Sequence, residues 1–224
     1  MLEKNLAAVR ERLQKAAAKR GASLGDITLV AATKTVPVTT IRRAYALGMA
    51  HFGENRLQEA EEKIGALPPA IHWHFIGHLQ TNKVKKVLPA FELIHSLDRM
   101  RLARRIQREG EKIDRKIDVL LQVNIGLEKS KQGFHPGEVE DALTELATFS
   151  HLRILGLMAI APFFDDPEET RPYFRHLSDL SKQIQIPGVA MKYLSMGMSN
   201  DFEVAVEEGA NMVRLGSILF GERH

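Results

Sequence analysis

Two short stretches near opposite ends of the chain carry the side chains best suited to chemistry. In the first, the β-rich run of residues 27–33 is followed at once by Lys34. Lys34 has the same alternation as Val30 and Ala32, so its amine is expected on one face with them at a strand end. A lysine amine held neutral attacks an aldehyde to form a Schiff base, although a lysine at a strand end can simply reach solvent.

The second stretch has the residues of an anion site. Ser199 precedes a helical run and stands where an N-cap is expected. Gly216 and Ser217 lie in the last strand-like run; Gly216 has no side chain to block the approach of an anion to its N–H, and Arg214 shares its alternation. Hydroxyl, N–H and guanidinium donors together suit a phosphate, although a structural salt bridge of Arg214 and ordinary turn glycines would use the same residues.

Further polar side chains stand where other strand-like runs stop. Asn55 offers a donor and an acceptor to a ligand ring, but it can equally cap a helix that begins near Arg56. His72, His74 and His78 cluster around the next run. No carboxylate or fourth ligand stands at a spacing suited to zinc, so we expect packed, hydrogen-bonded histidines and no metal.

The elements that position these residues alternate along the whole chain. Strand-like runs are expected at residues 27–33, 51–53, 71–76, 93–96, 117–124, 154–160, 192–196 and 212–219. Helical runs are expected at residues 3–19, 41–47, 57–64, 81–88, 99–112, 136–149, 168–184 and 201–208.

Strict β/α alternation predicts a parallel sheet, and eight units in one chain of this length predict a closed (β/α)8 TIM barrel. We expect a single domain over residues 1–224, with the N-terminal helix filling the outer position that a final helix would occupy. The site should lie at the carboxyl ends of the strands, with phosphate held after strands seven and eight. The polar segment of residues 126–133 is either a cover for this end of the barrel or simply a long loop.

Composition excludes several classes of protein. The 224 residues carry a formal net charge of +3 and no cysteine, which rules out disulfides and thiolate catalysis. No apolar run is long enough to span a membrane, and residues 1–20 lack a signal-peptide core, so we expect a cytoplasmic protein. The basic runs at residues 83–86 and 99–105 fit solvated helix faces better than a nucleic-acid surface.

A lysine and a phosphate site at one end of a barrel indicate a phosphorylated aldehyde or ketone. Two such ligands remain open on this argument: a sugar phosphate in an aldolase-like enzyme, and pyridoxal 5′-phosphate (PLP).

Motifs spread over almost the whole chain resemble those of the PLP homeostasis proteins, single-domain relatives of the alanine racemase N-terminal barrel. The matching residues are Ala32-Thr33-Lys34-Thr35, Phe52-Gly53-Glu54-Asn55, His72-Trp73-His74-Phe75-Ile76-Gly77, Leu79-Gln80, Asn82-Lys83, Val123-Asn124, Glu128, Lys131, Gly133, Gly156-Leu157-Met158, Ser195-Met196-Gly197-Met198-Ser199, Asp201, Val213-Arg214-Leu215-Gly216-Ser217 and Phe220-Gly221. The last two serine- and glycine-containing motifs are highly specific as a pair.

The resemblance implies a type III PLP fold with the cofactor attached to Lys34. It implies that Ser199, Gly216 and Ser217 hold the phosphate and that Arg214 lies beside the pyridine nitrogen. Asn55 and Met158 are expected among the cofactor contacts, and Lys83 is given a part in cofactor exchange. A cation beside the ring nitrogen disfavours its protonation, which makes the ring a poor electron sink.

Three functions follow, in descending order. The first is a PLP carrier or buffer without established turnover, with recipient apoenzymes as partners. The second is a racemase-like enzyme of low activity, which is disfavoured because the resembling racemase takes a catalytic tyrosine from a C-terminal domain that this chain lacks; Tyr45, Tyr173 and Tyr193 stand at no expected strand end. The third is a Schiff-base aldolase. We expect a monomer with no membrane or nucleic-acid partner.

Overall fold

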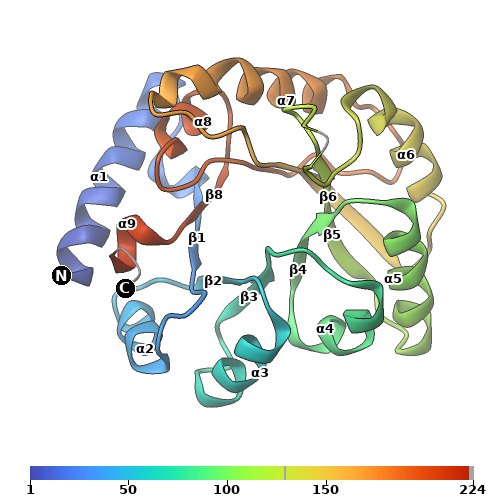
Figure 1. The fold of residues 1–224 in the computed structure, drawn as a ribbon, viewed down its shortest axis with the longest axis horizontal. Helices are drawn as coiled ribbons and strands as arrows, with labels where there is room; N and C mark the ends of the chain where they lie inside the picture. Colours follow the sequence, from blue (N-terminus) through green and yellow to red (C-terminus); the bar gives the residue numbers. More distant parts are fainter. Residues whose placement is uncertain (129, 222–224) are drawn as a thin grey trace.

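Eight parallel strands close a barrel in sequence order in the computed structural model, which describes residues 1–128 and 130–221. The strands are β1 (Thr28–Ala32), β2 (His51–Glu54), β3 (His72–Phe75), β4 (Leu93–Leu97), β5 (Ile117–Val123), β6 (Leu152–Ala159), β7 (Tyr193–Ser195) and β8 (Met212–Leu215). β8 pairs with β1 and completes the ring seen in Figure 1. The predicted TIM barrel is confirmed.

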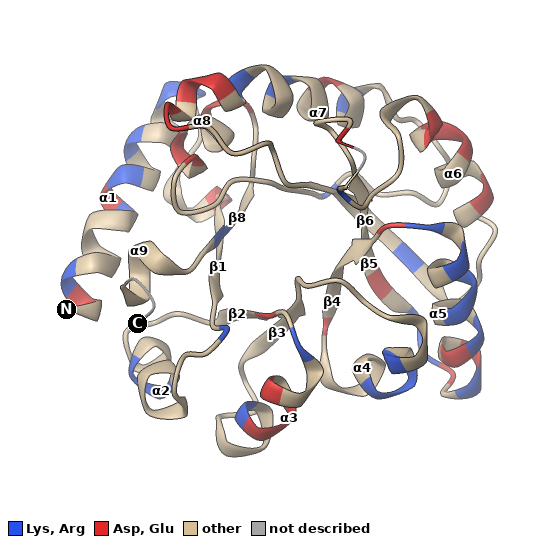
Figure 2. Cartoon of the chain, viewed as in Figure 1, with Lys and Arg blue, Asp and Glu red and all other residues tan. Residues whose placement is uncertain are grey.

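Helices surround the barrel on its outer side (Figure 1). They are α1 (Leu2–Lys19), α2 (Val38–Ala46), α3 (Leu57–Ala66), α4 (Val84–Ala90), α5 (Met100–Lys112), α6 (Val139–Leu146), α7 (Arg171–Gln183), α8 (Phe202–Glu207) and α9 (Ser217–Phe220), with single 3₁₀ turns η1 (Leu24–Asp26), η2 (Thr81–Lys83), η3 (Pro136–Glu138) and η4 (Pro167–Thr170). Most charged side chains lie on these outer helices (Figure 2).

Helix α1 is amphipathic because Leu6, Val9 and Leu13 recur at helical spacing and are all buried. It packs against α8 and α9, as expected of a helix that fills the last outer position of the ring. Two long-range ion pairs, Arg12–Glu203 and Lys19–Glu207, fasten it to α8. Such exposed pairs add little stability, so the buried apolar face is what holds α1 in place.

The prediction that the eighth strand continues to residue 219 was wrong. β8 ends at Leu215, and residues 217–220 form the single-turn helix α9. The run Ile218-Leu219-Phe220 is apolar and looks like a strand, and a helix of four residues is too short to display a helical period. This difference matters because the turn into α9 brings Gly216 and Ser217 to the carboxyl end of the barrel.

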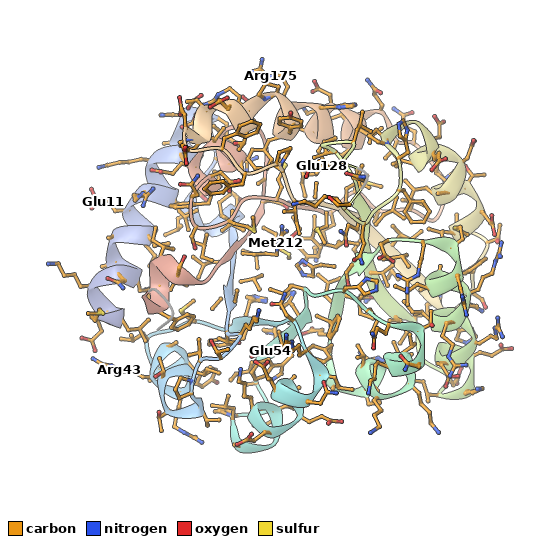
Figure 3. All side chains as sticks on the ribbon, viewed as in Figure 1. Glu11, Arg43, Glu54, Glu128, Arg175 and Met212 are labelled. Atoms are coloured by element: carbon orange, nitrogen blue, oxygen red, sulfur yellow. The ribbon has the colours of Figure 1, made fainter. Side chains whose placement is uncertain are left out.

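Two apolar regions fill the molecule. The larger lies between the strands and the helices, whereas the smaller lies inside the barrel and consists of Val30, Leu93, Leu120, Met158 and Met212. Met212 is labelled in Figure 3, near the centre of the ring. Because Val30 faces this inner cluster while Ala31 faces the helices, the expected alternation along β1 is confirmed.

Over the described residues, no helix combines the length and the hydropathy needed to cross a bilayer. The segment after β5 folds back on that strand, since Asn124 N donates to Phe134 O at 2.9 Å and the Asn124 amide donates to Glu128 O at 2.9 Å. Lys129, part of the predicted polar segment, lies outside the described residues.

Candidate functional site

Two pockets open at the carboxyl ends of the strands, and Lys34 lines both. The first, the Gly216 pocket, holds about 280 Å³ and is lined by Lys34, Thr35, Pro37, Thr40, Gly216 and Ser217 among others. The second, the Lys83 pocket, holds about 410 Å³ and is lined by Lys34, Asn55, Gly77, His78, Gln80 and Lys83 among others. The structure therefore brings together most of the predicted site residues around one lysine.

Lys34 lies two residues beyond the end of β1, in a turn closed by the Val36 N–H, which donates to Thr33 O at 2.9 Å. Thr35 has a φ of 63°, and its N–H donates to Glu59 Oε2 at 3.1 Å. The Lys34 amine makes no hydrogen bond or ion pair with any other described residue, so it is available to a ligand in either pocket.

A buried ion pair lies directly beneath this turn. Lys63 Nζ donates to Glu54 Oε1 at 2.7 Å and to Thr33 O at 2.7 Å, and the Thr33 hydroxyl donates to the same carboxylate oxygen at 2.6 Å. The Glu54 side chain is fully buried, and its position at the end of β2 is labelled in Figure 3. Burial raises the pKa of Glu54, while the bonds from Lys63 and Thr33 oppose that rise.

Asn55 lines the Lys83 pocket and does not cap a helix. The N-cap of α3 is Arg56, without any side-chain cap bond, so the helix-cap alternative for Asn55 was wrong. The backbone of Asn55 packs tightly on Gly77, where an added Cβ would lie 2.3 Å from Asn55 O. Gly77 therefore allows the ends of β2 and β3 to approach closely, which turns the Asn55 amide towards the pocket.

Ser199 was predicted to be the N-cap of the following helix, and this prediction was wrong. The N-cap of α8 is Asp201, which accepts from Met198 N at 2.6 Å. Ser199 Oγ instead accepts from Gly216 N at 3.3 Å and from Ile218 N at 3.4 Å. The hydroxyl thus joins the loop after β7 to the first turn of α9, as the geometry of a phosphate site after strands seven and eight requires.

Arg214 points into the barrel and is 5% exposed. Its Nη1 donates to Ser195 Oγ at 2.6 Å and to Ser195 O at 2.9 Å, and its Nη2 donates to Ala159 O at 3.0 Å. No carboxylate among the described residues pairs with it, so a structural salt bridge does not explain its place. Burial lowers its pKa to about 10, which leaves the guanidinium charged at neutral pH.

Met158 belongs to the inner apolar cluster, is 1% exposed and lines neither pocket. The expectation for the histidines was correct for His74, which is buried between two other imidazoles, His51 at 3.0 Å and His95 at 2.9 Å. His72 and His78 bond carboxylates instead, Glu92 and Asp98 respectively.

Sequence reasoning missed Lys63, His95 and Ser195. Lys63 stands three residues after Ala60 and six after Leu57, on the buried face of α3, and a charged residue at such a position was the available signal. His95 sits in the apolar strand β4, where a lone polar side chain that faces the interior needs a hydrogen-bond partner.

Comparison with known proteins agrees with this geometry. The alanine racemase N-terminal domain family matches residues 4–224. The pyridoxal phosphate homeostasis protein of Aquifex aeolicus (strain VF5) is 46% identical over 220 residues, which cover 97% of this chain and 96% of that protein.

Among solved structures, PipY of Synechococcus elongatus PCC7942 without PLP matches with a TM-score of 0.88 at 36% identity, and PipY with PLP bound matches with 0.83 at 35%. Each match covers 99% of this chain and 100% of PipY. An alanine racemase of Clostridium difficile 630 shares the fold at a TM-score of 0.76 and 16% identity, over 99% of this chain and 59% of the racemase. The chain therefore belongs to the pyridoxal phosphate homeostasis proteins, which are built on the alanine racemase N-terminal barrel.

Proposed function

We propose that this chain binds PLP as a Schiff base on Lys34 and serves PLP homeostasis by holding and releasing the cofactor. The observation that carries the proposal is the free Lys34 amine between two open pockets, one of which is lined by Gly216 and Ser217. The names of the relatives and the PLP bound to PipY support the same assignment.

The residues present fit the cofactor. When bound, PLP supplies an aldehyde that condenses reversibly with a primary amine. Lys34 provides that amine, and the hydroxyls of Ser199 and Ser217 with the N–H of Gly216 provide donors for a phosphate. Asn55 lies on the other side of Lys34, where its amide suits the polar edge of a ring.

Arg214 favours holding the cofactor over transforming it. Its charge is not balanced by an ion pair, and a cation beside the ring nitrogen opposes protonation of that nitrogen. An unprotonated ring withdraws electrons weakly, so carbanion chemistry is disfavoured. Moreover, the tyrosines Tyr45, Tyr173 and Tyr193 line neither pocket, which leaves a two-base racemisation without a tyrosine acid.

Release to other proteins is the second half of the proposal. Lys83 lines the same pocket as Lys34 and offers a second primary amine through which cofactor can leave the barrel. We place this role in the cytoplasm, with PLP-requiring apoenzymes as recipients and the chain acting as a monomer. The large apolar side chains that are exposed, such as Ile113, Leu127 and Phe163, are scattered and form no contiguous stripe in the sequence.

A transfer assay tests this function. The protein is loaded with PLP, freed of excess cofactor and mixed with an inactive apoenzyme that requires PLP, and the return of that enzyme's activity is followed. We expect activity to return faster than with an equal amount of Lys34→Ala protein treated identically. Rapid turnover of an amino acid by the loaded protein itself, with no transfer, would contradict the carrier function.

A further inference from the structure

A continuous column of buried polar side chains runs from Arg214 down through the barrel interior. Ser195 Oγ lies 2.6 Å from Arg214 Nη1 and 3.0 Å from His95 Nδ1. His95 Nε2 lies 2.9 Å from His74 Nδ1, and His74 Nε2 lies 3.0 Å from His51 Nδ1. Five strands contribute one side chain each, and His51 at the start of β2 ends the column at the amino-terminal side of the barrel.

The hydrogen bonds of this column can point in only one direction. An arginine only donates, so Ser195 Oγ accepts from Arg214. Within the described residues the Ser195 hydroxyl has one remaining partner, His95 Nδ1, so it must donate there to leave no buried group unsatisfied. His95 then carries its proton on Nε2 and donates to His74, which in turn donates from its own Nε2 to His51.

The column also has to be neutral. A protonated imidazole donates from both nitrogens, which would place two donors face to face at one of the links. Burial lowers the pKa of His74 to about 3, with further lowering by His51 and His72. Burial, assisted by His74 and Arg214, lowers the pKa of His95 as well.

We propose that His95, His74 and His51, acting through Ser195, are positioning residues that fix the guanidinium of Arg214 while leaving its charge uncompensated. This inference rests on the proposed function, which places Arg214 beside the cofactor ring. A carboxylate would orient Arg214 equally well but would cancel part of its charge. A chain of neutral acceptors orients the group and preserves the cation that opposes protonation of the ring.

A metal site does not explain these histidines. The facing nitrogens at each link are within hydrogen-bond distance of each other, and no group of three or more potential ligands in the described chain is arranged around one ion. At its lower end His51 stacks on His72, with ring centroids 4.7 Å apart, and His72 bonds Glu92. The column is thus anchored at both ends by fixed partners.

The direction of the column is tested on the protein without cofactor, by ¹⁵N NMR of the imidazole nitrogens. We expect His95 and His74 each to show one tautomer, protonated on Nε2, with no titration from about pH 5 to about pH 8. Nδ1 protonation of either residue, a mixture of tautomers or a titration in that range would overturn the proposal.

The positioning role is tested with two variants of one residue. In His95→Gln, the amide can still accept from Ser195 and donate to His74; in His95→Leu, the column is cut with little loss of volume. We expect His95→Leu to weaken PLP binding about tenfold and to shift the absorption band of the loaded protein, while His95→Gln stays within about threefold of the wild type. His176→Gln, at an exposed position on α7, is the matched control.

The outcomes separate this inference from the proposed function. Equal effects of His95→Gln and His95→Leu, or an unshifted band in His95→Leu, would mean that the column only packs the barrel, even if Lys34 binds PLP. Failure of the wild type to bind PLP would contradict the proposed function and with it the positioning role, while the tautomers would still report whether the column has the stated direction.

Discussion

Two lysines meet the same short turn after β1, and they differ in almost every respect. The amine of Lys63 is buried and donates to Thr33 O and to Glu54, whereas the amine of Lys34, the next residue after Thr33, has no partner among the described residues. An ammonium fixed by two acceptors is held in its protonated form and cannot attack an aldehyde. The structure thus assigns one lysine to support and leaves the other free to react.

This division also separates stability from function. The Glu54–Lys63 pair lies under the turn and ties α3 to the ends of β1 and β2, so its loss should affect folding. Lys34 lines two pockets and contributes no contact of this kind, so its loss should affect only ligand attachment. Four changes test how sharp this separation is.

The largest expected effect is that of Lys34→Ala. We expect complete loss of the visible band with added PLP and of the borohydride-reducible attachment, because no other amine lies between the two pockets. The melting temperature should change by no more than about 2 °C, since the removed amine has no partner. Lys85→Ala, at an exposed position, is the control; a normal band in Lys34→Ala would show that another lysine carries the cofactor.

The reverse result is expected for Lys63→Met. Removal of one partner of a buried ion pair leaves Glu54 without its main donor, which should lower the free energy of unfolding by about 3–5 kcal/mol while PLP remains attached to Lys34. Denaturant unfolding measures the first quantity and borohydride trapping the second. An unchanged stability, or loss of attachment without loss of stability, would reverse the roles of the two lysines.

The instability of Lys63→Met should depend on pH. Burial already raises the pKa of Glu54 above that of an unfolded chain, and loss of the Lys63 bond removes an opposing cause. The folded variant then binds a proton more readily than the unfolded one, so its stability falls as pH rises above the ordinary carboxyl range, near 4.3. Unfolding measured from about pH 5 to pH 8 should show a growing deficit relative to the wild type; a constant deficit would contradict this reasoning.

Arg214→Gln should weaken cofactor binding without moving it from Lys34. Glutamine can still donate to Ser195 but brings no charge, so we expect affinity for PLP to fall about tenfold and the absorption band to shift. Spectral titration with PLP measures both. A variant that aggregates while its cofactor spectrum stays normal would show that Arg214 has a structural role only.

The smallest expected effect is that of Ser199→Ala. The hydroxyl joins Gly216 and Ile218 by two long hydrogen bonds, so its loss should weaken PLP binding about threefold, with attachment still at Lys34. Ser181→Ala, which removes a hydroxyl bonded within α7, is the matched control. Equal affinities of Ser199→Ala and the wild type would remove Ser199 from the phosphate site.

The sequence predicted the barrel and the position of Lys34 because both follow from local periodicity: alternation of strands and helices, and parity along one strand. It did not predict that β8 ends at Leu215 or that Ser199 joins α9, because a single helical turn leaves no periodic pattern. The histidine column and the Glu54–Lys63 pair join residues from separate elements, and only the closed barrel brings them into contact.

The most direct test of the account is borohydride reduction of the PLP-treated wild-type protein, followed by peptide mass analysis. The account predicts a visible band that reduction removes, with a pyridoxyl adduct on Lys34 and none on Lys63. An adduct on Lys63 or Lys83 in place of Lys34, or a protein that stays colourless with added PLP, would contradict it.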